Sequence, residues 1–310
     1  MPVSDAFCPA GISSFFEVCD RDPAGHPITD PARVGARGGG FALTRGVTSR
    51  VSVRKGQRRR IEIRINSKPA PYANTTRSAV EQLINLTGIS AEVKIEIDVR
   101  VPIAAGFGTS AAGTLASCLA LSDAADLHVT FNELGRITHV AEVVNRTGLG
   151  TASALLFGGF VLVKEPGAPG IGLVDRLRFP PGHSIICACL KPIYTRDVLV
   201  KQLESSRAQT AAKATINAIE RNCTLRTFLN ESRKFGKEAG FETPNVTRTI
   251  LTMMKSGAIG AAQNMIGEAV HGAANDREVR GIVSVVKKAF PTAKVFAAPI
   301  DNQGVRLLEN

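Results

Sequence analysis

The stretch from residue 92 to residue 127 constrains the fold more than any other part of the chain. Residues 92–101 (EVKIEIDVRV) alternate between apolar and charged or polar side chains, which predicts a half-buried strand ending at Pro102. Residues 102–109 (PIAAGFGT) form a glycine-rich loop, and the Ala/Leu-rich composition of residues 110–127 predicts a helix. Backbone N–H groups of such a loop, at the start of a helix, commonly bind an anion. The segment therefore predicts an anion-binding loop between a strand and a helix.

Two common phosphate-binding loops fit this segment poorly. The Walker loop needs G-x-x-x-x-G-K-[ST], and Gly-Lys-Ser/Thr occurs nowhere in the chain. The dinucleotide fingerprint G-x-G-x-x-G/A is matched literally by Gly106, Gly108 and Ala111. That fingerprint normally follows a buried strand directly, whereas here an amphipathic strand is broken at Pro102 and small residues intervene.

A third pattern fits the loop. Residues 102–112 match P-x-x-x-G-[LF]-G-[ST]-S-A-A, so the loop resembles the second signature of the GHMP kinases, a family of small-molecule kinases. The resemblance implies that the anion is the phosphate chain of ATP. The glycines let the backbone approach the triphosphate, the helix N-terminus presents free N–H groups, and the hydroxyls can reach phosphate oxygens or Mg²⁺. The expected ATP-binding residues are Pro102, Ala105, Gly106, Phe107, Gly108, Thr109, Ser110, Ala111 and Ala112.

Four further stretches resemble one branch of this family, the archaeal pantoate kinases. They are AFCPAGISSFFEVCD near the N-terminus, VGARGGGFAL at 34–43, THVAEVVNRTGLG at 138–150 and FGGFVLVKEPGAPG at 157–170. The resemblance is densest in residues 5–170. It implies ATP-dependent phosphorylation of pantoate to 4-phosphopantoate on the archaeal route to coenzyme A, with ATP and Mg²⁺ as cofactors. Homoserine, mevalonate and shikimate kinase activities are the alternatives within the family.

The resemblance also assigns roles to individual residues. Glu142 stands where the family's helix supplies a Mg²⁺-binding carboxylate, and Ser110 is expected to hold the metal with it. His139, three residues earlier on the same helical face, matches a histidine associated with pantoate binding. Arg37 and Lys164 are cations that can pair with the pantoate carboxylate or with the transferring phosphoryl group.

Two positions depart from the family pattern. Pantoate kinases usually have G-L-G-D where this chain ends the motif with Thr151, and Ala36 stands where a serine is common. A threonine is a poor proton acceptor at neutral pH, but phosphoryl transfer depends mainly on positioning and charge neutralisation. Thr151 is therefore kept as a catalytic candidate beside Ser110 and Glu142. An inactive or repurposed relative is the alternative.

Structural roles are the competing interpretation of the same residues. Glu142 could be a surface carboxylate paired with Arg146 one helical turn later, and His139 an ordinary half-buried histidine. Thr151 could cap a helix that begins after it. His271, in the stretch EAVHGA, is assigned a structural role because the sequence shows no partner for it.

The positive charge of the chain leaves open one function of a different class, nucleic-acid binding. The net charge is +11, with basic residues concentrated at Arg50–Arg60, which would suit a nucleic-acid-binding protein. However, the chain has no Trp and only two Tyr to stack on bases. We therefore expect a small-molecule substrate and no nucleic-acid partner. Family members often form homodimers, a state that nothing in the sequence derives.

The cysteines and the first residues of the chain indicate the cellular compartment of the protein. The six cysteines include no C-x-x-C pair, which is typical of reduced thiols in a cytosolic protein. The first residues lack the pattern of a signal peptide, and no apolar run approaches the roughly 18–20 residues that span a bilayer. We expect a cytoplasmic protein with no membrane partner.

The expected architecture is an α+β fold of two domains with the active site in the cleft between them. The Pro/Gly cluster KEPGAPGIG at 164–172 separates residues 1–170, the ATP-binding domain, from residues 180–310, the C-terminal domain. The first domain is expected to hold a mixed, largely antiparallel sheet with helices on one side, and the second to be ferredoxin-like. Residues 257–260 are a poor copy of a third family loop and receive no role.

Periodicity predicts the individual elements. Residues 51–53 and 61–65 are expected to form an antiparallel hairpin around Gly56. Further strands are predicted at 157–163, 183–190 and 294–300, with one short strand at the end of the chain. Helices are predicted at 75–87, 132–146, 197–221, 224–239, 244–255, 258–271 and 276–289.

Overall fold

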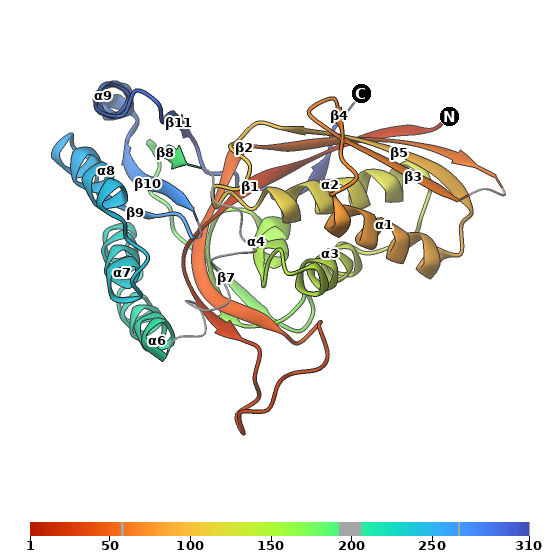
Figure 1. Cartoon of the computed structure of the whole chain (residues 1–310), viewed down its shortest axis with the longest axis horizontal. Helices are drawn as coiled ribbons and strands as arrows, with labels where there is room; N and C mark the ends of the chain where they lie inside the picture. The colour runs from red at the N-terminus through yellow and green to blue at the C-terminus, as the bar shows by residue number, and fades with distance from the viewer. Residues whose placement is uncertain (57–58, 192–205, 266, 310) are drawn as a thin grey trace.

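The strands of the protein form two sheets, shown in Figure 1 by a computed structural model that describes residues 1–56, 59–191, 206–265 and 267–309. The first sheet has the order β12-β1-β2-β5-β3-β4, and β6 and β7 extend it from β2. Its described pairs are antiparallel except for β3 with β5, which confirms the predicted mixed, largely antiparallel sheet. Its strands are β1 (Val3–Cys19), β2 (Gly35–Lys55), β3 (Arg60–Ile65), β4 (Lys68–Pro69), β5 (Ala91–Val99), β6 (Phe160–Glu165), β7 (Leu173–Leu177) and β12 (Arg306–Leu307).

The predicted hairpin of residues 51–53 with 61–65 is wrong. Strand β5 lies between β2 and β3, antiparallel to β2 and parallel to β3. Parallel neighbours need a crossover connection, and α1 (Asn74–Thr87) supplies it between β3 and β5. Helix α1 ends at Gly88 in the left-handed conformation, as the sequence predicts. Alternation identified the strands, but it carries no information on which strand pairs with which.

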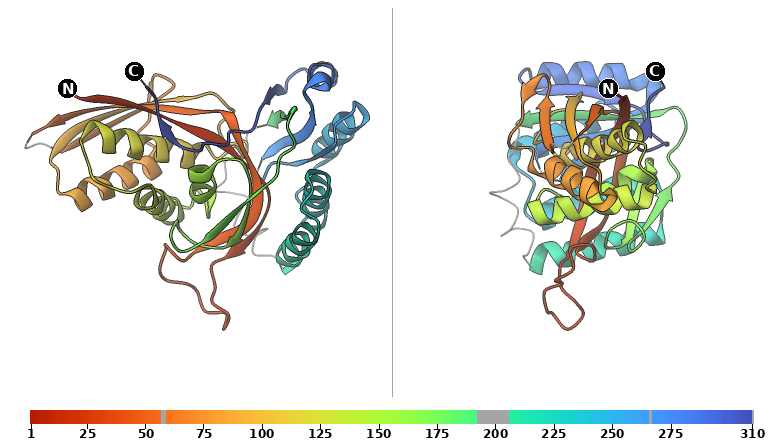
Figure 2. Two further views of the ribbon diagram at one scale, coloured as in Figure 1. Left: turned by 180° about the vertical axis from the view of Figure 1, so that it is seen from behind. Right: turned by 90° about the vertical axis from the view of Figure 1, so that its right-hand side faces the viewer.

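The helices of the first half cover one face of the first sheet, as predicted (Figures 1 and 2). Besides α1 they are α2 (Thr109–Ala124), α3 (Phe131–Asn145) and α4 (Thr151–Phe157). Helix α2 packs against β1 and β2 on one side and against α1 and α3 on the other, so almost all of its small side chains are buried. This central position fixes the start of α2, and hence the glycine loop before it.

The second sheet has the order β11-β8-β10-β9, and its described strand pairs are all antiparallel. In chain order the unit runs strand, helices, two strands, helix, strand, which is the ferredoxin-like arrangement expected. The elements are β8 (His183–Lys191), α6 (Ser206–Arg221), α7 (Leu225–Glu238), α8 (Pro244–Lys255), β9 (Gly260–Gln263), β10 (Glu268–Asn275), α9 (Asp276–Ala289) and β11 (Lys294–Ala298). Of the helix predicted at 197–221, residues 197–205 lie outside the described part of the chain.

The helix predicted at 258–271 is wrong, because this segment forms β9 and the first half of β10. Strand β10 pairs with β8 on one side and β9 on the other, and both of its faces are buried. Alanine and glycine fill it, so the period of two that marks a half-buried strand is missing from the sequence. The strand predicted at 157–163 begins at Phe160, since α4 extends to Phe157.

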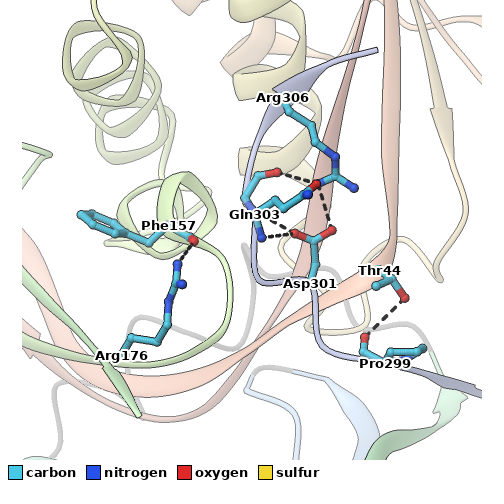
Figure 3. Close-up of polar contacts among 8 residues, drawn as sticks. Thr44, Phe157, Arg176, Pro299, Asp301, Gln303 and Arg306 are labelled. Carbon is cyan, nitrogen blue, oxygen red and sulfur yellow. Dashed lines mark hydrogen bonds and ion pairs between the residues drawn. The ribbon is translucent and has the colours of Figure 1, made fainter. Parts of the chain in front are cut away.

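The end of the chain returns to the first sheet (Figure 3). Asp301 is buried and accepts hydrogen bonds from the backbone N–H groups of Gln303 and Gly304 and from the Arg306 guanidinium. Strand β12 then pairs with β1 at Ala6. The limits 1–170 and 180–310 stay a prediction, and residues 306–307 are structurally part of the first sheet.

Phenylalanine side chains from both halves form a joint core. The ring of Phe228, on α7, lies 4.6 Å from Phe160, 5.3 Å from Phe41 and 5.5 Å from Phe15 between centroids. Those three rings come from β6, β2 and β1 of the first sheet. The two sheets are therefore joined by buried aromatic area. Within the described residues, no helix is both long and apolar enough to cross a membrane.

Truncation of this joint core should destabilise the whole chain. Phe228→Ala removes a fully buried ring, and we expect a loss of about 3–5 kcal/mol in the free energy of unfolding. The matched control is Phe131→Ala, because Phe131 is 53% exposed and its loss should change stability by less than about 0.5 kcal/mol. Urea unfolding measures both. Equal midpoints for the two variants would contradict the joint core.

Candidate active site

A cavity of about 960 Å³ lies where the glycine loop meets β1 and β2. The C-terminal end of α3 and the start of α4 line it as well, and Met265 reaches it from the second half. It contains Arg37, Ser110, Glu142 and Thr151, four of the predicted site residues. The fold thus brings together residues that are more than 110 positions apart in the sequence.

The glycine loop exposes its backbone to this cavity. Gly106 and Gly108 have φ values of 73° and 59°, a left-handed conformation that favours glycine, and Gly108 is the N-cap of α2. The side chain of Phe107 points the other way and is buried against Phe296, which anchors the loop. Ala105 to Ser110 line the cavity. The remaining expected ATP residues, Pro102, Ala111 and Ala112, are not among the lining residues. The two alanines are buried in the hydrophobic core between the first sheet and its helices.

Glu142 has the most perturbed carboxyl group of the cavity. It lies on α3, is only 2% exposed, and its Oε2 atom is buried without a hydrogen-bond partner. Burial raises the pKa of Glu142 from 4.5 to about 8, although hydrogen bonds from Ser110 and Thr147 oppose that rise. A Cβ at Gly148 would lie 2.7 Å from Oε2, so a side chain at position 148 would collide with the carboxylate. The alternative of a surface carboxylate paired with Arg146 is excluded by this burial.

An unsatisfied buried carboxylate oxygen beside a hydroxyl fits a divalent cation. Mg²⁺ prefers oxygen ligands and usually takes one or two carboxylates together with substrate phosphates. Ser110 lies at the second residue of α2, and its hydroxyl is a hydrogen-bond partner of Glu142. The pair therefore offers the donor set that the sequence predicts for Mg²⁺ at the phosphate loop.

His139 and Lys164 do not line the cavity. The Nε2 atom of His139 lies 2.8 Å from the backbone oxygen of Val34, and burial lowers the pKa of the ring, so the neutral form is favoured. His139 thus supports the segment before β2 from behind the cavity wall. Lys164 lies on β6, where its ammonium is 3.8 Å from the carboxylate of Asp175. Their substrate-binding roles stay predictions.

Arg37 lines the cavity and is held in place by Glu17. The Arg37 Nε atom donates to Oε2 of Glu17 at 2.7 Å, and the Glu17 carboxylate is almost fully buried. Lys213, on α6, lies 3.8 Å from the other oxygen of Glu17. Two cations therefore share one carboxylate, which leaves positive charge at this end of the cavity for an anionic ligand.

Thr151 does not cap a helix, contrary to the structural alternative. It is the first residue of α4, whose N-cap is Gly150, and no side chain caps this helix. Its methyl group lies beside the glycine loop, 2.8 Å from where a Cβ at Gly108 would be. Ala36, the other position that departs from the family pattern, also lines the cavity. Both departures therefore border the ligand site.

Two further lining residues, Arg146 and Met265, have no ligand-binding role that the sequence predicts. Arg146 has φ 56° at the end of α3 and no ion pair among the described residues, which makes it a cation available to a ligand. A left-handed arginine at the end of a helix has no sequence signal beyond the Gly148 that follows shortly after it. Met265 lies between β9 and β10, close to the glycine loop, whereas the poor copy of a third family loop is at residues 257–260.

The raised pKa of Glu142 predicts a pH-dependent stability. Between pH values of about 5 and 8 the folded state binds one more proton than the unfolded state, so stability falls as pH rises. Glu142→Gln removes the ionisable group. Without divalent cations, we expect its Tm to match the native protein at about pH 5 and to exceed it at about pH 9. Thermal melts across this range measure the effect, and a Tm difference independent of pH would contradict it.

Comparisons with known proteins agree with this geometry. Residues 74–159 match the family model for the N-terminal domain of GHMP kinases. The chain is 29% identical to a pantoate kinase of Methanospirillum hungatei over 95% of its length and 93% of that protein. It is 33% identical to a pantoate kinase of Thermococcus kodakarensis over 63% of its length and 62% of that protein.

Solved structures share the whole fold. A protein described as a phosphotransferase related to the CoA biosynthesis pathway superposes with a TM-score of 0.86 at 22% identity, over 98% of both chains. A homoserine kinase from Cytophaga hutchinsonii superposes with a TM-score of 0.73 at 18% identity, over 99% of this chain and 98% of that one. Together with the glycine loop and the two-sheet architecture, these matches show that residues 74–159 correspond to the N-terminal domain of GHMP kinases and that the whole chain is similar to a pantoate kinase and shares the fold of these solved structures.

Proposed function

We propose that this protein is a pantoate kinase, a phosphotransferase with an alcohol group as acceptor that converts pantoate and ATP to 4-phosphopantoate and ADP. The observation that carries the proposal is the cavity that joins the glycine loop to the buried Glu142, in a chain similar over almost its full length to a pantoate kinase. Such a reaction is a step in the biosynthesis of coenzyme A. The description of the structural neighbour names the same pathway.

The nucleotide end of the cavity is the glycine loop. The backbone N–H groups of the loop and the first turn of α2 face the phosphates, and the positive end of the α2 dipole favours the anion. Glu142 and Ser110 would hold Mg²⁺. When bound, the ion neutralises charge on the phosphate oxygens. The raised pKa of Glu142 means that the carboxyl group must lose its proton to bind the metal.

The acceptor end is the part of the cavity around Arg37. The guanidinium, oriented by Glu17, is suited to bidentate pairing with the pantoate carboxylate. A pantoate hydroxyl oxygen bonds to the γ-phosphorus as the bond from phosphorus to the ADP oxygen breaks. The hydroxyl proton leaves late in a loose transition state and passes to an oxygen of the transferred phosphoryl group, so no carboxylate is required at Thr151. Catalysis then rests on positioning by Ser110, Arg37 and the loop.

The cytoplasm is the compartment that we assign to this reaction. All six cysteines are free, four of them buried, which is typical of proteins kept in a reducing environment. A homodimer stays a prediction from the family resemblance.

Acceptor specificity tests the proposed activity. We would measure ADP release with Mg·ATP and matched concentrations of pantoate, homoserine, mevalonate or shikimate. Turnover should be selective for pantoate, and Ser110→Ala and Glu142→Ala should abolish it because each removes a predicted metal ligand. Selective turnover with another acceptor would reassign the substrate.

Ligand-induced stabilisation separates the remaining alternatives. A ligand at 100 times its dissociation constant should add about 2.7 kcal/mol to the free energy of unfolding. Stabilisation by Mg·ATP without turnover of any acceptor would indicate an inactive relative. Salt-sensitive stabilisation by a polynucleotide and none by Mg·ATP would favour a nucleic-acid-binding protein.

Arg146 gives a separate test of anion binding in the cavity. A left-handed conformation costs an L-residue about 1–2 kcal/mol, so Arg146→Gly should keep or raise the Tm. The same change removes a cation, and a lost charged hydrogen bond of about 1.5–3 kcal/mol predicts a fall of at least tenfold in kcat/KM. The control is Asp126→Gly, because Asp126 has φ 55° and lies outside the cavity. Equal kcat/KM values for the two variants would contradict the role of Arg146.

A further inference from the structure

Three buried polar side chains form a hydrogen-bonded network between the two sheets. The Oγ atom of Ser14, on β1, lies 2.8 Å from Nε2 of His271, on β10. The Nδ1 atom of His271 lies 2.8 Å from Oδ1 of Asn264, which directly follows β9. All three residues have no exposed surface. They do not line the cavity, so none of them can contact a ligand held there directly.

The donors and acceptors of the network run in one direction. Oδ1 of Asn264 can only accept, so Nδ1 of the histidine carries the proton and donates it. Nε2 is then an acceptor, and the Ser14 hydroxyl donates to it. Burial lowers the pKa of His271 to about 3, so the ring stays neutral at physiological pH. The sequence assigned His271 a structural role without partners; both of its partners come from distant segments.

Ser14 reaches the second sheet because β1 is irregular there. The register of β1 on β2 shifts between Ser13 and Phe15, and Ser14 is the extra residue. A bulge of this kind redirects one side chain and is common next to active sites. The backbone oxygen of the neighbouring Ser13 accepts a hydrogen bond of 2.8 Å from the N–H of Met265. Ser13 therefore binds Met265 directly, and Ser14 is linked to Asn264 through His271.

The described residues of the turn between β9 and β10, Asn264, Met265 and Gly267, lie directly against the glycine loop. A Cβ at Gly106 would be 2.9 Å from the Cβ of Asn264, and a Cβ at Gly267 would be 2.9 Å from the carbonyl carbon of Ala105. Met265, between them, lines the cavity. The turn is also closed on itself, since the Asn264 N–H donates to the oxygen of Ala269 at 2.9 Å. A displacement of the turn would therefore displace the backbone that faces the phosphates.

We propose that Ser14, His271 and Asn264 are positioning residues that hold the β9–β10 turn against the glycine loop and so set how well the loop binds the nucleotide. The network ties the second sheet to the first at the point where the loop is supported. The identity of the nucleotide rests on the proposed function, whereas the coupling between bulge, turn and loop does not.

The experiment removes one hydrogen bond of the network, the one between Ser14 and His271. Ser14→Ala removes the donor to His271 and leaves both backbones and the ring in place. We expect faster amide hydrogen exchange in peptides that contain Asn264 and Met265 and in those that contain residues 104–108. A misplaced loop should also raise the dissociation constant of ADP and the KM for ATP by about tenfold to 100-fold. The KM for pantoate should change much less.

Ser184→Ala is the matched control. The Ser184 hydroxyl donates to Asp276 at 2.7 Å, which links β8 of the second sheet to helix α9, away from the cavity. It should lower the Tm and leave loop exchange and ADP binding unchanged. If Ser14→Ala also lowers only the Tm, the network is merely structural and the proposal is overturned.

A second variant tests the network further, and a separate assay distinguishes failure of the network proposal from failure of the proposed substrate. His271→Phe retains an aromatic ring without hydrogen bonds, and combining it with Ser14→Ala should add little to the rise in the ADP dissociation constant, because both act through one network. Fully additive effects would overturn the proposal. Failure of the native enzyme to use pantoate would reject the proposed substrate. The hydrogen-exchange and ADP-binding measurements would still show whether the network positions the glycine loop.

Discussion

The site depends on the close approach of three backbones around the glycine loop. Gly106 lies against the β9–β10 turn, and Gly108 lies against the start of α4 and against Gly11 of β1. A Cβ at either position would come within 3.0 Å of a neighbouring side-chain atom, in a backbone conformation that already disfavours one. Segments from the first sheet, from α4 and from the second sheet thus converge on one short loop. The surface that we propose for phosphate binding exists only when all of them are in place.

Electrostatics then divides the cavity into two ends. At one end Glu142 is buried next to Ser110, and desolvation raises its pKa, so the cation that we propose for this site must displace a proton. At the other end Arg37 and Lys213 share Glu17, so positive charge remains for an anionic acceptor. A metal-bound triphosphate and a hydroxy acid are complementary to this separation of charge. The overall charge of +11 would favour the approach of both anions.

Local patterns predicted much of the fold and part of the site. The strand, loop and helix around residues 92–124 and the helices at 244–255 and 276–289 were found because periodicity and end signals are local properties. The β3–β5 pairing and the strands β9 and β10 were missed, because pairing partners and burial on both faces are not encoded in a short window. Within the site, Glu142 and Ser110 came from a motif, whereas Arg146 and Met265 belong to no pattern that the sequence displays.

The order of side chains along short segments is enough to predict the glycine loop, the resemblance to GHMP kinases and the residue types available for chemistry. Folding of the chain, by contrast, buries Glu142 with an unsatisfied oxygen, turns His139 toward the backbone of Val34 and joins Ser14 to Asn264 through His271. Each of these depends on contacts between segments far apart in the chain. Burial and hydrogen-bond partners, which set pKa values and orient side chains, arise only when those segments pack together.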